Sequence, residues 1–325
     1  MRHTSQKLLG SRLPSTEPWW VNTVQCGDAL ELLQLLPNGS INCCITSPPY
    51  WQLRNYGMEG QLGLEPSING YLLSLGKVFQ EVWRVLKPNG TCWVNLGDTF
   101  AGNKKCNSDP KPQRELHNIQ LRKQTRRFPA KCLLQIPSRF AISMCDQGWI
   151  LRNEIVWHKP NCMPSSAKDR FTVDFEKIFF FTKSPKYWFE TQWEPYKTDV
   201  WKLQRVRETR DYFLKAPYQR NFPRRYRPEG RIKRCVWSVT TKCYSGAHAA
   251  VFPEDLMETP ISAGCPEGGI VLDPFCGSGT TLLTAKRLNR QYLGIDLNPE
   301  YATLAEKRIK ESISFGGDDE RECHG

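Results

Sequence analysis

The stretch from Gly269 to Asp296 constrains the fold more than any other part of the chain. Its first apolar run, 269–272, predicts a buried strand that leads into a glycine-containing segment, D-P-F-C-G-S-G-T-T at 273–281. Apolar residues at helical spacing then predict a helix from about Thr280 to Asn289, and a second apolar run, 291–295, predicts another strand. A strand, a helix and a strand in this order predict an α/β fold with a parallel sheet.

The turn in this unit has the features of a ligand-binding loop. Gly277 and Gly279 let the backbone approach a bound molecule closely. Asp296 follows the second strand, roughly 20 residues further on, where an acid can bind a ribose. The turn lacks the third glycine of the dinucleotide fingerprint and the Gly-Lys-Ser/Thr of a phosphate-binding loop. Both absences argue against NAD and ATP as ligands.

A second stretch, T-S-P-P-Y-W at 46–51, follows the apolar run 41–45, which predicts another buried strand. The two prolines end that strand because neither can donate a ladder hydrogen bond. Ser47 and Tyr50 are therefore expected on a stiff loop at the carboxyl end of a strand, where open α/β sheets bind ligands. The alternative is an ordinary proline turn with an aromatic neighbour.

This loop suits the methylation of an exocyclic amine. The amino nitrogen of cytosine or adenine is a poor nucleophile because its lone pair is conjugated into the ring. Its two hydrogens need acceptors, and the Ser47 hydroxyl and the Pro48 carbonyl can both accept. The locked φ of proline holds that carbonyl in place, and Tyr50 offers a flat face for a flipped base.

Together the two motifs resemble those of the β class of amino-directed DNA methyltransferases, which make N4-methylcytosine or N6-methyladenine from S-adenosyl-L-methionine. As in that class, the catalytic motif comes first and the cofactor motif last. The resemblance covers nearly the whole chain except its middle. It implies a Rossmann-like S-adenosylmethionine-dependent methyltransferase fold with permuted motif order, in which the strands before the two motifs are neighbours and both loops open on one cleft.

The resemblance also assigns site residues. It implies a catalytic loop made of Ser47, Pro48, Pro49 and Tyr50. It implies a cofactor site made of Asp273, Phe275, Gly277, Gly279, Thr280 and Asp296, with contributions from Asp28, Phe252 and Pro253. For Asp28 a helix N-cap is an equally good interpretation. No metal is needed for this chemistry, and the 13 cysteines, which form no C-x-x-C pair, indicate reduced thiols rather than a zinc site.

Residues 194–234 are predicted to form an inserted target-recognition region. They hold 13 Lys/Arg and five Asp/Glu, a net charge of +8 out of +12 for the whole chain. Such a charge favours double-stranded DNA as the partner, and the candidate DNA contacts are Arg220, Arg224, Arg225, Arg227, Arg231, Lys233 and Arg234. A disordered basic linker is the alternative, although the interleaved aromatic residues argue against it.

The predicted division of the chain follows from these assignments. Residues 1–193 form the catalytic half of one domain, 194–234 the insert, 235–313 the cofactor-binding half, and 314–325 a disordered tail. We expect an irregular cover over the cofactor or the base at 52–67 and a basic loop at 100–131. Helices are expected at 72–86, 137–147 and 298–313, and strands at 21–25, 91–96, 149–158 and 177–182. The 159–170 connection resembles ones that line the target-base pocket in the family.

The absence of a long apolar segment and of a signal core predicts a cytoplasmic protein. We expect it to be encoded by a bacterium or a phage and to act as a monomer or homodimer. A cognate restriction endonuclease is a possible functional partner. Family members with Ser first in the motif mostly modify cytosine N4, so cytosine is favoured over adenine N6. An RNA or protein methyltransferase and a catalytically dead DNA-binding protein stay open. Methylation at cytosine carbon 5 is not favoured, because no Pro-Cys dipeptide occurs.

Overall fold

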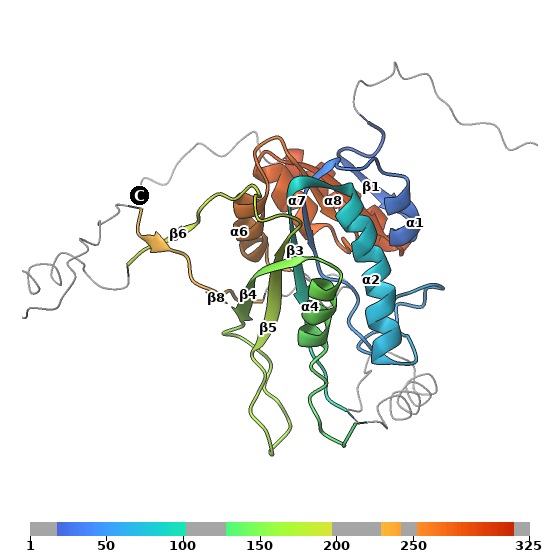
Figure 1. Ribbon diagram of the computed structural model, residues 1–325, viewed down its shortest axis with the longest axis vertical. Coiled ribbons are helices and arrows are strands. Elements are labelled where there is room, and N and C mark those ends of the chain that lie inside the picture. The colour runs from blue at the N-terminus through green and yellow to red at the C-terminus, as the bar shows by residue number, and fades with distance from the viewer. Residues whose placement is uncertain (1–17, 102–127, 197–228, 242–251, 315–325) are drawn as a thin grey trace, which may run out of the picture.

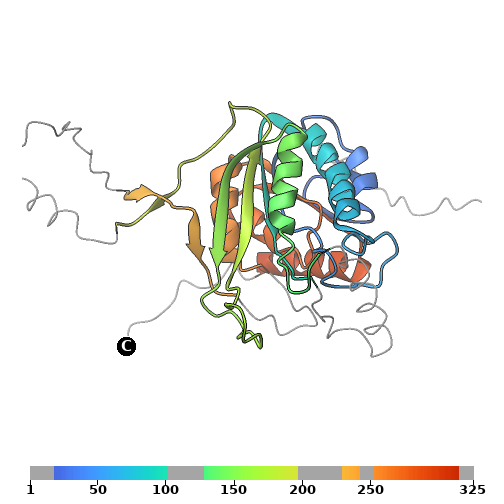
Figure 2. The ribbon, with the colours of Figure 1, turned by 60° about the horizontal axis from the view of Figure 1, so that its bottom comes forward.

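The computed structural model describes residues 18–101, 128–196, 229–241 and 252–314. Its centre is an eight-stranded sheet with the strand order β1-β10-β9-β2-β3-β5-β4-β8. The strands of this sheet are β1 (Thr23–Cys26), β2 (Ile41–Thr46), β3 (Leu86–Leu96), β4 (Ile150–His158), β5 (Phe175–Thr182), β8 (Val236–Ser238), β9 (Ile270–Asp273) and β10 (Gln291–Asp296). A two-stranded ribbon, β6 (Trp193–Glu194) with β7 (Arg231–Ile232), lies away from the sheet in Figures 1 and 2.

Helices cover both faces of the sheet, which therefore forms the middle layer of three (Figure 1). One face carries α1 (Ala29–Gln34), α2 (Ile68–Val85) and α4 (Ile136–Asp146). The other carries α6 (Glu254–Gly264), α7 (Thr280–Arg287) and α8 (Pro299–Ser314). Each face has its own apolar core because a strand points alternate side chains to opposite sides. Among the described residues, no helix has the length and apolar character needed to cross a membrane.

Strand directions decide where the loops meet. Strands β1, β10, β9, β2 and β3 are parallel to one another, β5 runs antiparallel between β3 and β4, and β8 is parallel to β4. One edge of the sheet, here called the ligand edge, therefore collects the carboxyl ends of all the strands except β5, which contributes its amino end. Ligands in open α/β sheets bind at such an edge.

Most predicted elements are present with ends shifted by a few residues. The strand expected at 91–96 is longer, because β3 begins at Leu86 directly after α2. Its pairing with β2 jumps from Ile41↔Leu86 to Cys43↔Thr91, so the segment holding Pro88 and Gly90 bulges out of register. Helix α6 and the short strands β6, β7 and β8 were not predicted. The predicted 314–325 tail, apart from its first residue, and most of the 100–131 loop lie outside the described residues.

Candidate active site

The two motif loops emerge side by side at the ligand edge. Strands β2 and β9 are hydrogen-bonded neighbours, with Cys43 opposite Val271 and Cys44 opposite Leu272. The last residue of β2, Thr46, donates from Oγ1 to Oδ1 of Asp273, the last residue of β9, over 2.6 Å. The expected adjacency of the two strands is therefore confirmed, and a direct hydrogen bond ties the start of one loop to the start of the other.

Asp273 is a structural link between the loops. Its side chain is 2% exposed, and its Oδ1 also accepts from the Phe275 backbone N–H at 3.1 Å. Burial raises the pKa of this carboxyl from 3.8 to about 6, while hydrogen bonds from Thr46 and Thr281 oppose the rise. The carboxylate thereby holds the start of the turn that connects β9 to α7.

The catalytic loop is stiff and anchored from below. Pro48 is buried, and the Tyr71 hydroxyl donates to the Pro49 carbonyl at 2.7 Å. Trp51, 2% exposed, fills the core under the loop and donates from Nε1 to the Glu65 carbonyl at 3.0 Å. The Tyr71 hydroxyl thus holds the loop at Pro49, and the role of the Pro48 carbonyl as an acceptor for a substrate amine stays a prediction.

Tyr50 enters a polar network that was not predicted. Its hydroxyl donates to Glu176 Oε2 at 2.7 Å and accepts from Asn95 Nδ2 at 2.5 Å and from Ser47 Oγ at 3.3 Å. Asn95 Nδ2 also donates to Glu176 Oε2 at 2.6 Å, and Lys159 forms an ion pair with Glu176 Oε1. Burial, together with the Glu176 carboxylate, raises the pKa of the Tyr50 phenol well above its usual value. The phenol therefore keeps its proton at neutral pH.

Gly97 allows Tyr50 to take this position. It directly follows β3, and a Cβ added at Gly97 would lie 2.6 Å from Tyr50 Cε2. Any larger residue would collide with the ring, so the glycine places the aromatic face at the ligand edge.

The cofactor motif provides an acceptor beside an open backbone turn. Gly277 and Gly279 have φ values of 52° and 78°, which side-chain-bearing residues rarely adopt. Nothing lies within 4 Å of a Cβ added at Gly277, so the backbone there is open to a ligand. Asp296 accepts from the N–H groups of Gly277 and Asn298, each at 2.8 Å, and burial raises its pKa. Carboxylate oxygens have lone pairs beyond these two bonds, so the arrangement fits a ribose diol.

Two further contacts close this part of the site. Arg308 on α8 donates to the Ser278 carbonyl at 2.6 Å and to Thr280 Oγ1 at 3.2 Å, which fixes the turn from outside. Tyr56 packs edge-on against Tyr301 with ring centroids 6.1 Å apart. Burial raises the pKa of Tyr56, and the Asp296 carboxylate contributes to the rise. Tyr56, within the 52–67 segment, thus lies near Tyr301 and Asp296, and a cover over the cofactor or the base stays a prediction.

The remaining predicted cofactor residues lie around this edge. Asp28 accepts from the Glu31 N–H at 3.0 Å and caps α1, which is the structural alternative considered for it. Phe275 packs, partly buried, against the apolar core that α2 covers, and Phe252 packs beside Trp157 with ring centroids 6.1 Å apart. Pro253 is buried at the N-cap of α6. Their contacts with a cofactor stay predictions.

The predicted DNA contacts fall into two groups. Arg220, Arg224, Arg225 and Arg227 lie outside the described residues. Arg231 and Arg234 both donate from Nε to Glu194 Oε1 at 2.7 Å. Lys233 donates to Thr259 Oγ1 at 2.7 Å and lies over the Trp237 ring, and burial lowers its pKa. These three side chains thus hold the β6–β7 ribbon and its surroundings, and a DNA contact by them stays a prediction.

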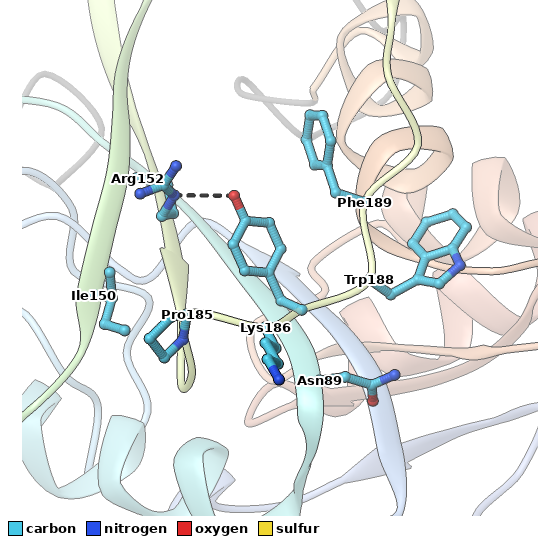
Figure 3. A pocket seen from close by; sticks show the side chains of 8 residues that line it. Asn89, Ile150, Arg152, Pro185, Lys186, Trp188 and Phe189 are labelled. Atoms are coloured by element: carbon cyan, nitrogen blue, oxygen red, sulfur yellow. Dashed lines mark hydrogen bonds between the residues drawn. The ribbon is translucent and has the colours of Figure 1, made fainter.

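A groove lies at the other end of the strands, beside the start of β4 and the end of β5 (Figure 3). It is lined by Asn89, Ile150, Arg152 and residues 185–189, and Arg152 donates to the Tyr187 hydroxyl at 2.9 Å. None of the predicted site residues lines it. In the described part of the chain, no cluster of three His, Cys, Asp or Glu side chains could hold a metal ion.

Comparisons with known proteins show the family of the chain. The model of the N6/N4 family described as DNA methylase matches residues 41–307. The Type II methyltransferase M.Cfr9I of Citrobacter freundii is 40% identical over 95% of both chains. The Type II methyltransferase M.XycI of Xanthomonas campestris pv. cyanopsidis is 42% identical over 87% of this chain and 86% of its own.

Solved structures show the same fold. A putative DNA modification methylase of Thermus thermophilus, crystallised with S-adenosyl-L-methionine, is 26% identical, with a TM-score of 0.56 over 92% of this chain and 96% of its own. The cytosine-N4-specific PvuII DNA methyltransferase superposes with a TM-score of 0.60 at 20% identity, over 92% of this chain and 87% of its own. The chain therefore belongs to the family of amino-directed DNA methylases that includes these Type II methyltransferases.

Proposed function

We propose that the protein transfers a methyl group from S-adenosyl-L-methionine to the N4 amino group of cytosine in double-stranded DNA, as the modification enzyme of a restriction-modification system. The observation that carries this proposal is Ser47 at the first position of the catalytic loop, tied through Thr46 to the cofactor loop. Relatives named Type II methyltransferases, from bacteria such as Citrobacter freundii, support the modification role and a cytoplasmic location.

The cofactor loop is suited to hold the methyl donor. Asp296 offers carboxylate acceptors to the ribose hydroxyls, and the turn at 277–279 offers open backbone. When bound there, S-adenosyl-L-methionine supplies an electrophilic methyl group carried by a sulfonium. Tyr56 and Tyr301 help to cover this position and exclude water from it.

The catalytic loop prepares the amino group for attack. The Ser47 hydroxyl and the Pro48 carbonyl accept its two hydrogens, which draws the nitrogen toward tetrahedral geometry. The Tyr50 ring, backed by Gly97, stacks on the base that has left the duplex. Base flipping costs a few kcal/mol, and much of the rate then comes from holding the nitrogen in line with the methyl group. As the bond from nitrogen to the methyl carbon forms, the bond from that carbon to sulfur breaks, S-adenosylhomocysteine leaves, and the nitrogen releases one proton to solvent.

The surface around the ligand edge suits a DNA partner. The connection between β4 and β5 projects beyond the sheet in Figures 1 and 2. It carries two fully exposed apolar side chains, Met163 (89% exposed) and Phe171 (96%), beside the exposed Lys168. Arg170 stacks on Phe100 with its guanidinium 3.8 Å from the ring centre, which fixes this connection next to β3. We infer that Phe171 contacts the partner base left unpaired by flipping.

The test is transfer of a labelled methyl group from S-adenosyl-L-methionine to unmethylated duplex DNA, RNA or protein, followed by hydrolysis of the product. The proposal predicts label in duplex DNA alone, recovered as N4-methylcytosine. Label recovered as N6-methyladenine would refute the cytosine assignment. Label in RNA or protein would refute DNA as the substrate, and binding of DNA without transfer would indicate a catalytically dead protein.

A further inference from the structure

The network around Tyr50 runs along the ligand edge across four neighbouring strands. Ser47 and Tyr50 follow β2, Asn95 lies on β3, Glu176 on β5, and Lys159 follows β4, in the order in which these strands pair. The antiparallel direction of β5 brings Glu176 to this edge, because it is the second residue of its strand. A catalytic serine is thereby connected to a carboxylate on the third strand along.

The chemistry of the groups fixes the direction of every hydrogen bond in this network. An ionised carboxylate only accepts and an ammonium only donates, so the Lys159–Glu176 pair leaves Oε2 of Glu176 as an acceptor. The single proton of the Tyr50 hydroxyl is donated to that oxygen. Asn95 turns its Nδ2 toward both acceptors, and its buried Oδ1 has no hydrogen-bond partner among the described residues.

The consequence reaches Ser47. Because the only proton of the Tyr50 hydroxyl is engaged in the hydrogen bond to Glu176, the phenol oxygen can only accept from the serine hydroxyl. The Ser47 proton is then directed at Tyr50, and the lone pairs of Ser47 Oγ are left for another donor. Without the bond to Tyr50, the serine hydroxyl could rotate and point its own hydrogen toward the amino group of the base. Two donors would then face each other, and the serine could not accept the hydrogen of the amino group.

We propose that Glu176 is a positioning residue that acts through Tyr50 to present the Ser47 hydroxyl as a hydrogen-bond acceptor to the amino group of the target base. This inference rests on the proposed transfer to an exocyclic amine and holds for cytosine or adenine. It gives a reason for placing a partly buried carboxylate close to a loop whose first residue is a neutral serine. The loop gains the acceptor character that an aspartate at position 47 would have had by itself.

Three variants test the role. Tyr50→Phe keeps the ring and removes the connecting hydroxyl. Glu176→Gln keeps the shape, but Lys159 retains the amide oxygen and the NH₂ group faces Tyr50, which reverses or breaks the chain of donors. The third variant combines the two. Glu154→Gln is the matched control, because Glu154 forms a similar ion pair with Lys177 between the same two strands, at 2.8 Å, outside the network.

The readouts are the single-turnover rate of methyl transfer to duplex DNA, and separate affinities for DNA and for S-adenosylhomocysteine. Each single variant is expected to slow transfer by roughly tenfold or more, the effect of one lost hydrogen bond in the transition state, with both affinities within about twofold of wild type. The combined variant is expected to be no slower than the slower single variant, since both break the same chain. Glu154→Gln keeps the wild-type rate.

A wild-type rate in Tyr50→Phe would overturn the proposal, and this variant decides even if Glu176→Gln fails to fold. Rate losses that multiply in the combined variant would overturn it as well, because they would show that the two side chains act independently. Losses explained by weaker DNA binding would also overturn it, because they would indicate a structural role. Wild-type transfer to adenine would contradict the cytosine assignment alone, because the ratios between variants decide the role of Glu176 on either base.

Discussion

Replacing Asp273 by asparagine should make the protein more stable at neutral pH and should remove one component of its pH dependence. The asparagine oxygen can still accept from Thr46 Oγ1 and from the Phe275 N–H, and its amide group can donate to Thr281. The change therefore keeps the shape and most hydrogen bonds of a side chain that is 2% exposed, and it removes the buried negative charge.

The magnitude follows from the pKa. Burial raises the pKa of Asp273 to about 6, against 3.8 for an ordinary aspartate. The folded protein therefore binds this proton more tightly than the unfolded chain does. Protonation of Asp273 therefore contributes favourably to the free energy of unfolding. This contribution is complete below pH 3.8 and is lost as the pH rises through about 6. In total it amounts to ~3 kcal/mol, at 1.36 kcal/mol per pKa unit, and roughly 1.5 kcal/mol of it falls between about pH 5 and pH 8.

The assay is urea unfolding of the wild-type protein and of Asp273→Asn across this range. Urea is preferred because guanidinium chloride screens charges. The difference in unfolding free energy between the two proteins cancels most other titrating groups, Asp296 and Asp98 among them, whose pKa values burial also raises. We expect the unfolding free energy of the variant to increase relative to that of the wild type as the pH rises. A difference in unfolding free energy that does not change with pH, or one that shifts in favour of the wild type as the pH rises, would refute the reasoning.

Three further predictions concern the site. Gly97→Ala should displace the Tyr50 ring, because the new Cβ lies 2.6 Å from Cε2, and should slow methyl transfer by roughly tenfold or more in a single-turnover assay. Asp296→Ala should weaken S-adenosyl-L-methionine binding by roughly 1–3 kcal/mol in a calorimetric titration, since it removes charge-assisted hydrogen bonds to the ribose. Phe171→Ala should leave the unfolding free energy within about 0.5 kcal/mol of wild type, because the side chain is 96% exposed, and should lower DNA affinity in a binding titration.

Matched variants control for general effects of these substitutions. Gly76→Ala lies within α2, where the new Cβ meets only the end of the Gln147 side chain, and should keep full activity. Leu73→Ala removes an exposed apolar side chain on α2 and should leave DNA affinity unchanged. Equal transfer rates in the two glycine variants, an unaltered titration for Asp296→Ala, or equal DNA affinity for Phe171→Ala and Leu73→Ala would each contradict the corresponding prediction.

The sequence alone predicted those parts of the candidate site that consist of contiguous residues. Strand ends, glycines and prolines act on the local backbone, so the segments that contain them can be recognised in the sequence. These segments are the turn at 273–281 with the acid at Asp296, and the proline loop at 47–50. The resemblance to the family implied that the strands before the two motifs are neighbours. The pairing of β2 with β9 confirmed this adjacency.

The contacts beneath the catalytic loop could not be predicted in this way. Glu176 lies 126 residues from Tyr50 and 81 from Asn95, and its position depends on the antiparallel direction of β5. One feature of the sequence could have drawn attention to Glu176. It is a charged residue at the start of the predominantly apolar run 175–182, and the formation of a strand does not require a glutamate there. Helix α6 was not predicted because Pro260 lies inside it, and a proline usually indicates that a helix ends or is kinked.

The most direct test of the central claim compares wild type and Ser47→Ala on unmethylated duplex DNA with a deuterium-labelled methyl donor, by mass spectrometry of the released nucleosides. Ser47 stands first in the catalytic motif, as in the family members that mostly modify cytosine N4, and its hydroxyl is expected to accept from the amino group of the base. We predict labelled N4-methylcytosine from wild type and none from Ser47→Ala, with cofactor affinity nearly unchanged. Equal amounts from both proteins, or labelled N6-methyladenine in its place, would contradict the account.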